Sequence, residues 1–534
     1  MLTWNVAGVN NNPFEYWVTA EAEAPAYIDL MQRLERILVQ PQAYGDPPQD
    51  MDVGVNQVFT QSMWDELKGR MDTEGWQHVE QVDEAWRQSF RERKIISQFL
   101  LDKVMGKKRL TSMPDRVTNT VHLMPVRTDG AGGEANTEPG GTVFACPEPA
   151  CRPTVINNYD GDMSSLSTWW TAWMKFMFDT HLTIKVKGSL VQKRPCEMLD
   201  RISRSKYPDL TEEEEQMSIP LQTLCLAIYD AILVHLMNTI SPDGEWQQVK
   251  RLLLERLFRR KHDRSQEIIS KYDHVEVICL QETCGVLGDR LMACPLNDSH
   301  FVMVPLKVDA KRDQNSLVLL SRRVFTEPKE VTGEILSRFS RAGGVTDGDL
   351  MAVSTRHKPS GQDVCVVSFH ADTNGLMTLP MLEAIQNCRV DQTSELCSHR
   401  FVMGLDANVY WDAKPDCQSL LGLTTWLADN GLTSCWGDSP TTELCQTTCH
   451  ARTFLQPQFH KALKFQDRIS KSDRNPKDWI VFYRAEFRSL QPALKDNTGQ
   501  MVFEEDTLLP TLSFPSDHGL VATVLELMQK EQQQ

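Results

Sequence analysis

Seven short apolar runs follow one another between residues 276 and 527, and each has the length of a β-strand. They are EVICLQE (276–282), HFVMVPL (300–306), SLVLLSRRVF (316–325), DVCVVSFHADT (363–373), RFVMGLDAN (400–408), DWIVFYR (478–484) and GLVATVLEL (519–527). Several are apolar at almost every position, which is typical of strands covered on both faces. The first ten residues have the same character and lead into a loop. These runs predict a core built from buried sheets.

The sequence between these parts has the periodicity of helices instead. Apolar side chains recur every 3.6 residues at Tyr27, Leu30, Met31, Leu34, Ile37 and Leu38. Similar patterns cover roughly 56–105, 164–178 and 220–258, whereas Pro125–Gly141 has the Gly, Pro, Asn and Asp content of a mobile loop. We therefore expect a mostly helical insertion over residues 21–270, with a flexible loop near 125–153, between the first strand of the core (1–20) and its remainder (271–534).

The charge balance limits the class of function. The chain has 56 Lys and Arg against 72 Asp and Glu, a formal net charge of −16. Such a field repels polyanions at long range, so a protein that coats nucleic acid non-specifically is not expected. A nuclease with a local basic groove remains compatible with this charge.

Cysteine usage and hydropathy indicate the compartment. The 14 Cys are scattered without the short spacings of a disulfide framework, and the N-terminus has no secretory signal pattern. The most apolar stretch, Ile219–Ile240, contains Gln222, Asp230, His235 and Asn238, so it predicts a buried helix and not a transmembrane segment. We expect an intracellular protein of the cytoplasm or nucleus.

Five motifs place groups that can bind a metal or a phosphate at the ends of the predicted strands. They are WNV (Trp4–Val6), LQE (Leu280–Glu282), SFHADTNG from Ser368, GLDAN from Gly404 and SDH (Ser516–His518), with KDWIVFY before the last. Each motif alone is weak, but in this order they resemble the endonuclease/exonuclease/phosphatase superfamily. The resemblance implies an α+β fold, a four-layer α/β/β/α sandwich of two packed sheets, interrupted after its first strand by the large helical insertion.

The resemblance also implies a Mg²⁺-dependent (or Mn²⁺-dependent) phosphoester hydrolase. Oxygen ligands suit such a cation. By similarity, Glu282 is the main metal ligand, and Asn5 and Asp517 contribute near the metal or through water. Without the other motifs, Glu282 would be read as a strand-end residue in solvent.

The remaining motif residues match catalytic roles in that superfamily. Asp406 matches the group that orients or deprotonates the attacking water, and Asn408 matches a group that hydrogen-bonds the transition state. His518 matches a histidine that contacts the scissile phosphate, and Asp478 matches the carboxylate that fixes its tautomer. His370 matches a second phosphate-contacting histidine. An Asx turn at Asp406 and a surface position for His518 are the ordinary structural alternatives.

Two departures from the family pattern reduce the number of branches of the superfamily that this chain could resemble. Ala7 stands where some repair nucleases carry a further carboxylate, and GLDAN lacks the Asp that usually follows its Gly. The presence of His370, where exonuclease III-like enzymes tend to have Tyr, points away from abasic-site repair. The inositol phosphatase signature around this strand is also missing.

Three weaker features bear on substrate, and each has a structural alternative. Lys250–Lys271 contains eight Lys and Arg, which could form a phosphate-steering patch but are more often a solvated helix face. Trp169, Trp170, Trp173 and Phe176 could stack bases, although their helical spacing favours packing in a core. In the segment from Thr447, where family members often place substrate loops, Arg452, Gln456 and Lys461 are candidate substrate-binding residues.

The leading hypothesis is therefore a phosphodiesterase or nuclease that cleaves nucleic acid or nucleotide by in-line attack of an activated water. Its first alternative is a phosphatase or a phospholipid-directed phosphodiesterase on the same core. Its second is a catalytically inactive scaffold whose helical insertion binds a partner protein. The full set of motif residues argues against the scaffold, although the insertion could still recruit a protein partner. The sequence does not discriminate DNA, RNA and small phosphoesters, or internal from terminal cleavage.

Overall fold

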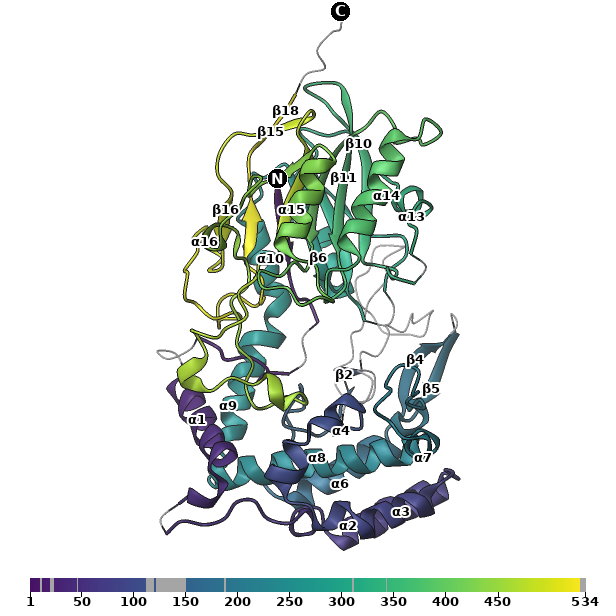
Figure 1. Cartoon of the computed structure of the whole chain (residues 1–534), viewed down its shortest axis with the longest axis vertical. Helices are drawn as coiled ribbons and strands as arrows, with labels where there is room; N and C mark the ends of the chain where they lie inside the picture. Colours follow the sequence, from purple (N-terminus) through teal and green to yellow (C-terminus); the bar gives the residue numbers. More distant parts are fainter. Residues whose placement is uncertain are drawn as a thin grey trace, which may run out of the picture.

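The computed structural model describes residues 1–9, 12–19, 24–45, 47–111, 120–121, 150–186, 189–309, 312–341 and 343–528. The Gly- and Pro-rich segment at 125–141, predicted as a flexible loop, lies outside these ranges. Figure 1 shows most strands gathered in one half of the molecule and many of the helices in the other.

Two six-stranded sheets form the strand-rich half. In order across the first sheet, the strands are β16 (Leu494–Asp496), β17 (Leu520–Ala522), β1 (Leu2–Asn5), β6 (Val277–Thr283), β8 (Asn315–Ser321) and β7 (His300–Met303). Those of the second are β13 (Leu432–Ser434), β14 (Asp478–Tyr483), β12 (Arg400–Asp406), β11 (Gln362–His370), β10 (Leu350–His357) and β9 (Lys329–Glu330). Every predicted run contains a strand, and the last one splits into β17 and β18 (Leu525–Leu527).

Alternating side chains of these strands pack in two directions. In β6, Ile278 and Leu280 join a cluster with α10 (Lys261–Ser270) and α11 (Gly285–Ala293), whereas Cys279 faces the second sheet. The other side of the second sheet packs against α13 (Thr332–Leu336), α14 (Thr378–Val390) and α15 (Leu420–Asp429). Helices therefore cover both outer faces of two packed sheets, and the predicted α+β sandwich of four layers is confirmed.

A glycine marks the closest approach of the two sheets. A Cβ atom built on Gly404 of β12 would lie 2.6 Å from Cys279 Cβ and 2.9 Å from Thr3 Oγ1 of the opposite sheet. Only glycine fits there without displacing a strand. This contact explains why the GLDAN motif begins with Gly even though the residue after it differs from the usual family pattern.

The helical half is formed by the chain between β1 and β6. Its α-helices are α1 (Pro25–Val39), α2 (Gln61–Thr73), α3 (Val79–Gln88), α4 (Lys103–Lys107), α6 (Leu166–Phe178), α7 (Glu212–Gln216), α8 (Ser218–Ile240) and α9 (Glu245–Leu253). Helix α9 continues through a π-helical turn, η6 (Leu254–Arg259), toward α10. Two-stranded pairs, β2 (Thr120–Val121) with β3 (Ala150–Cys151) and β4 (Leu182–Val186) with β5 (Ser189–Lys193), accompany them. Shorter elements of the other half are α12 (Leu296–Ser299), α16 (Thr442–Cys445) and β15 (Phe487–Ser489).

The buried face of α1 matches its sequence pattern. Tyr27, Leu30, Met31, Leu34, Ile37 and Leu38 are the buried residues of this helix. In α6, Trp169, Trp170, Trp173 and Phe176 are buried as well, with exposed fractions of 6% or less. The expectation that they pack in a core is confirmed, so they are not free to stack on bases.

Helix α8 is long and apolar enough to cross a membrane, but 89% of its most apolar window is buried inside the protein. It is the predicted buried helix. Asp230 within it makes an ion pair with Arg152 at 3.2 Å and accepts hydrogen bonds from Thr154 and Trp173. These partners explain how a carboxylate is accommodated there.

The basic stretch from Lys250 to Lys271 is not uniformly a solvated helix face, and that expectation is wrong for two of its members. Lys250 and Lys261 are only 2% and 4% exposed. Lys250 donates a hydrogen bond from Nζ to the Thr154 carbonyl at 2.7 Å. Lys261, the first residue of α10, lies where the helical segment returns to the sandwich.

The helical half and the sandwich share a core. Cys449, Ala451, Leu455, Phe459, Leu508 and Leu512, from loops of the C-terminal part, belong to the same cluster as the buried residues of α1, α6 and α8. Strands β1 and β6 are parallel neighbours although the whole helical segment separates them in sequence. The chain thus leaves the sheet after β1 and returns beside it. The exact division at residues 20 and 270 stays a prediction.

Candidate active site

Strand register brings the site residues of the second sheet together. In the ladders of β11, β12 and β14, His370 is paired with Asp406, and Asp406 with Asp478. In the first sheet, Asn5 ends β1, and Glu282 lies near the end of its parallel neighbour β6. Asn5 Nδ2 joins the two sheets by donating to Asp406 Oδ2 at 2.8 Å and to Glu282 Oε1 at 3.2 Å.

Glu282 has a strained backbone. Its φ is 50°, and the pairing of β6 with β8 shifts register between Leu280 and Thr283. A left-handed conformation at a non-glycine residue is held in place by its surroundings and is often found at functional sites. Gly8 packs so closely behind it that a Cβ there would lie 2.4 Å from the Glu282 carbonyl oxygen. This kink sets the position from which the carboxylate enters the site.

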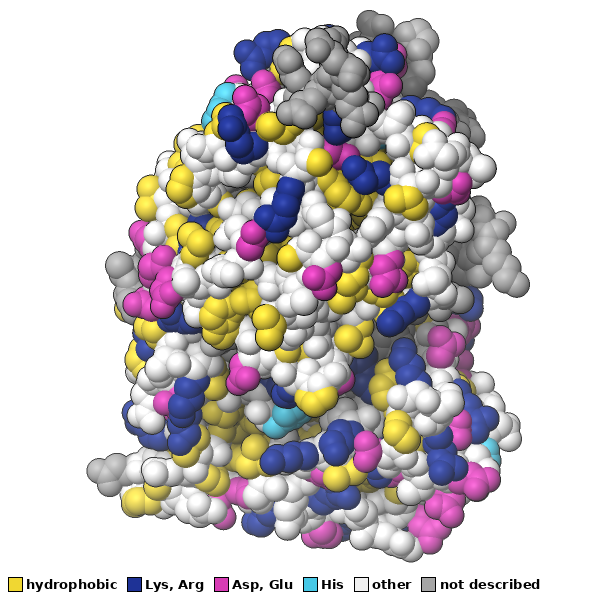
Figure 2. All heavy atoms as spheres, turned by 45° about the horizontal axis from the view of Figure 1, so that its top comes forward, with side chains coloured by type: hydrophobic (Ala, Val, Ile, Leu, Met, Phe, Trp, Pro, Cys, Tyr) yellow, Lys and Arg dark blue, Asp and Glu magenta, His cyan; other side chains and the backbone are white. Residues whose placement is uncertain are grey.

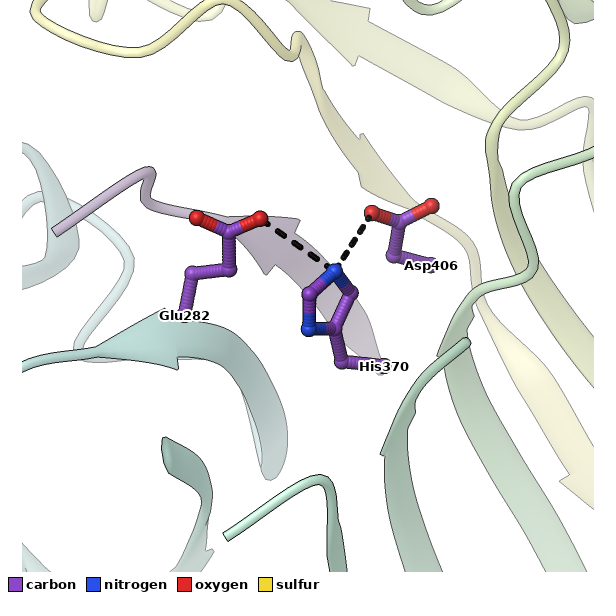
Figure 3. Close-up of side chains that lie close together, drawn as sticks. All are labelled: Glu282, His370 and Asp406. Atoms are coloured by element: carbon purple, nitrogen blue, oxygen red, sulfur yellow. Dashed lines mark ion pairs between the residues drawn. The ribbon is translucent and has the colours of Figure 1, made fainter. Parts of the chain in front are cut away.

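His370 lies between two carboxylates, as Figure 3 shows. Its Nε2 is 3.2 Å from Glu282 Oε1 and 3.7 Å from Asp406 Oδ2. Burial alone would lower the pKa of His370, but the two carboxylates outweigh it and raise the pKa to about 9. Burial would likewise raise the pKa of Glu282, yet His370, His518 and Asn5 lower it to about 2. Glu282 is therefore ionised and His370 cationic at neutral pH.

Asp406 is the centre of the arrangement and is only 1% exposed. Besides the bond from Asn5, its Oδ1 accepts a hydrogen bond from the Asn408 backbone N–H at 3.1 Å. His518 Nε2 is 3.9 Å from Asp406 Oδ2. The carboxylate thus has an imidazole on each of two sides, and a phosphate placed against it would meet both.

His518 is held by Asp478. The distance from Nδ1 to Asp478 Oδ2 is 2.9 Å. Burial by itself would lower the pKa of His518, but Asp478 and Asp406 raise it to about 10. The loop that carries His518 is fixed to β1, because Trp4 Nε1 donates to the His518 carbonyl at 3.0 Å and Ser516 Oγ donates to the Asn5 carbonyl at 2.6 Å. Nδ1 of His518 is therefore engaged by Asp478, and its Nε2 faces Asp406.

Asn408 is positioned by residues that sequence reasoning missed. Its φ is 47°, its Nδ2 donates to the Ala371 carbonyl at 3.1 Å, and its Oδ1 accepts from Lys477 Nζ at 2.9 Å. Lys477 directly precedes Asp478 in the KDWIVFY run, so its place next to a motif carboxylate was an available signal. Gln314, which donates to Glu282 Oε2 at 2.7 Å, carried no signal, since it stands in a loop before β8.

The other predicted residues lie beside this group and not in it. Asp517 is half-buried, and it makes no hydrogen bond or ion pair with any residue of the described ranges. Arg452 Nη1 is 3.4 Å from Glu15 Oε1 and donates to Gln456 Oε1 at 3.4 Å. Gln456 is 2% exposed and bonds the Thr453 carbonyl, so its amide is used inside the loop, whereas Lys461 is exposed. Their roles in binding metal or substrate stay predictions.

Two overlapping sets of side chains could hold a metal ion. They are Glu282, His370 and Asp406, and Asp406, Asp478 and His518, with ligand atoms within 4.8 Å of one another in each set. The carboxylate oxygens of Glu282 and Asp406 are the donors that a hard divalent cation prefers. The donor set therefore fits a divalent metal, and the identity of the ion is a matter for the proposal below.

Comparisons with known proteins find similarity over parts of the chain. A family model described as a domain of unknown function (DUF8234) matches residues 52–251, all within the helical segment. No curated protein sequence matches the chain. Among solved structures, the human Nocturnin catalytic domain with bound sulfate is similar over 50% of this chain and 86% of its own, with 16% identity and a TM-score of 0.33.

Two further structures have the same kind of similarity. An endonuclease/exonuclease/phosphatase from Bacteroides vulgatus covers 50% of this chain and 92% of its own, with 12% identity and a TM-score of 0.33. D. rerio TDP2 complexed with single strand DNA product covers 51% and 96%, with 12% identity and a TM-score of 0.32. Structures of the superfamily predicted from the motifs are thus among the neighbours, while the description of fold and site rests on the sheets and contacts given above.

Proposed function

We propose that this chain is a Mg²⁺- or Mn²⁺-dependent phosphodiesterase that cleaves nucleic acid or nucleotide by attack of an activated water. One observation carries the proposal. Asp406, Glu282, Asn5 and the two cationic histidines meet at one end of the sandwich, although they come from five separate segments of the chain. A purely structural role does not require buried carboxylates and imidazoles at that density, since each is costly to bury.

Each side chain has a task that its geometry allows. Glu282, with Asp406 beside it, would hold the metal ion, which when bound supplies positive charge against the phosphate. Asp406 accepts a proton from the attacking water while the new P–O bond forms and the bond to the leaving oxygen breaks. His518, through Nε2, and His370 stabilise the charge that develops on the phosphoryl oxygens.

The order of reactivity among phosphoesters tests this function. We expect purified protein with Mg²⁺ to hydrolyse bis-(p-nitrophenyl) phosphate and oligonucleotides faster than p-nitrophenyl phosphate or inositol phosphates, and EDTA to stop the reaction. Preference for the monoesters would favour a phosphatase, and hydrolysis of phospholipid headgroups alone would favour the lipid-directed alternative. Inactivity toward all of them would leave a scaffold that binds a protein partner through the helical segment. An intracellular location belongs to the same proposal.

Replacing Glu282 by Gln tests the metal assignment. The substitution removes the charge and places an amide N–H₂ next to donors from Asn5 or Gln314, so metal binding should weaken. We expect the Mg²⁺ concentration for half-maximal rate to rise by about tenfold or more, with partial recovery of the rate at high Mg²⁺. Titration of the rate with Mg²⁺ measures this.

The matched control is Glu276→Gln. Glu276 lies just before β6, at the opposite end of the strand, where it pairs with Arg323 on the surface. Its Mg²⁺ dependence should equal that of the wild type. An unchanged Mg²⁺ dependence in Glu282→Gln would show that the metal is held elsewhere.

A further inference from the structure

Lys261 lies at the junction between the helical segment and the active site. It is the first residue of α10 and is 4% exposed. With Tyr16, Phe258 and Pro515 it lines a small cavity of about 10 Å³, the volume that one water molecule needs. Pro515 directly precedes the Ser516–His518 motif. The side chain of Lys261 is therefore enclosed by both halves of the protein next to a catalytic loop.

The ammonium group of Lys261 has no bonded partner. No residue in the part of the chain that the structure describes accepts a hydrogen bond from it or pairs with it within 4.0 Å. Two lysines of the same stretch differ, because Lys250 donates to the Thr154 carbonyl at 2.7 Å and Lys271 to the Gly499 carbonyl at 2.6 Å. An anion bound beside this ammonium group would supply an acceptor that the described residues do not offer.

The charges around Lys261 show where such an anion would lie. Burial lowers the pKa of Lys261, and the carboxylates that oppose this shift are those of Asp517 and Glu282. Asp406 and Asp478, which surround the two histidines, are not among them. The geometry places Lys261 next to the loop that carries Asp517, because Pro515 of that loop borders the same cavity.

A second cation, Arg452, lies near the cavity that Lys261 lines. The guanidinium carbon of Arg452 is 5.7 Å from the centre of the Tyr16 ring, which also borders the Lys261 cavity. Asp517 is a charged neighbour of Arg452 as well as of Lys261. Tyr16 therefore lies near both a lysine from the helical segment and an arginine from a loop of the sandwich. Figure 2 shows, on one face, Lys and Arg side chains around a hollow in the lower part of the molecule.

We propose that Lys261, together with Arg452, binds a second phosphate group of the substrate, next to the phosphodiester that is cleaved. This inference rests on the proposed function and deepens it: the substrate is an oligonucleotide or a nucleotide with an additional phosphate, and not a diester with a single phosphate. Lysine acts on phosphate as a point charge, and arginine can bind two of its oxygens. The helical segment would thus take part in substrate recognition directly.

The test compares dinucleotides that differ only in a terminal phosphate. We would measure kcat/KM with Mg²⁺ for TpT, for its 5′-phosphorylated form pTpT and for its 3′-phosphorylated form TpTp. The wild type should prefer one phosphorylated form over TpT. Lys261→Met, which keeps the length and apolar stem of the side chain, should lower that preference by about tenfold or more, while the rate on TpT changes by less than about threefold.

Two further variants make the result interpretable. Arg260→Met removes the neighbouring, exposed cation, which pairs with Glu267 at 4.0 Å, and should keep the preference. Arg452→Met should lose it as Lys261→Met does, and it supplies the test if Lys261→Met fails to fold. Equal losses on TpT and on the phosphorylated forms would place Lys261 at the scissile phosphate and overturn the proposal. An unchanged preference in both Lys261→Met and Arg452→Met would overturn it too.

A binding measurement separates this inference from the proposed function. In an Asp406→Asn background, calorimetry should detect tighter binding of adenosine 3′,5′-bisphosphate than of adenosine 5′-monophosphate, and adding Lys261→Met should remove the difference. If this binding depends on Lys261 while the wild-type protein hydrolyses no diester, the phosphodiesterase is refuted and the phosphate site stands. Hydrolysis of diesters without such binding would leave the phosphodiesterase standing and refute the second phosphate site.

Discussion

Asp406→Asn is expected to lower the turnover of phosphodiesters by roughly 10²- to 10⁴-fold, the contribution of a general base. Asp406 is 1% exposed, and its carboxylate faces the imidazoles of His370 and His518 at 3.7 and 3.9 Å. An amide at this position has nearly the same shape but accepts no proton from water. The loss should appear in kcat, measured under single-turnover conditions, more than in KM.

The fold should survive this change at a moderate cost. Asp406 accepts one hydrogen bond from Asn5 Nδ2 and one from the Asn408 backbone N–H, and an Asn can accept only one of them with its single oxygen. Leaving a buried donor unsatisfied costs about 1–3 kcal/mol in the free energy of unfolding. Thermal denaturation of Asp406→Asn measures this cost. The control is Asp412→Asn, an exposed carboxylate in the loop that follows β12, which should change neither quantity. Full activity of Asp406→Asn would move the base to another residue.

Local patterns predicted most of the sandwich, since its strands are apolar on both faces and end in polar groups. Several short strands were missed, and the longest missed strand, β10 (Leu350–His357), begins with an apolar LMAV but continues with STRH. Its second half lies in a long antiparallel pair with β11 and is stabilised by that pairing more than by its own composition. Such pairing joins residues that are distant along the chain, so a local pattern does not reveal it.

The sequence predicted the site residues that belong to a motif. It did not predict residues that join the site only through a contact between two segments of the chain. Chain order placed Glu282, Asp406 and His518 at strand ends, but it contains no information about Gln314, which is recognised only by its hydrogen bond to Glu282. Lys261 is the clearest case. The stretch from Lys250 to Lys271 contains eight Lys and Arg, and only the packing of the helical segment against the Ser516–His518 loop determines that this one is buried.

Asp478→Asn is expected to lower the rate at pH 8 by about 30-fold, because most of the His518 side chains then lack the charge that stabilises an anionic transition state. Asp478 lies 2.9 Å from His518 Nδ1 and, with Asp406, raises the pKa of His518 to about 10. An Asn can still accept the Nδ1 hydrogen bond but supplies no charge. With an ordinary pKa of about 6.5, only about 3% of His518 would be cationic at pH 8.

The pH profile distinguishes this role from a structural one. In the wild type the activity should persist to high pH, because His518 loses its proton only near pH 10. In Asp478→Asn the alkaline limb should move toward lower pH, and part of the activity should return as the pH falls. The double variant with His518→Ala should be little worse than His518→Ala alone, since Asp478 acts through that imidazole. A uniform loss at every pH would show that Asp478 only supports the strand.

The free energy of unfolding should also depend on pH through His518, and it should fall as the pH rises. A histidine whose pKa is raised in the folded state stabilises that state fully below its unfolded value, here 6.5, and the contribution is lost as the pH rises through about 10. The wild type should therefore lose stability between these values, and His370, whose pKa is raised to about 9, adds to the loss. Asp478→Asn removes the part due to His518, so its free energy of unfolding should fall less steeply over this range. Chemical denaturation at pH 6, 8 and 10 measures the slope, and equal slopes in the two proteins would mean that His518 is not a cation in the folded state.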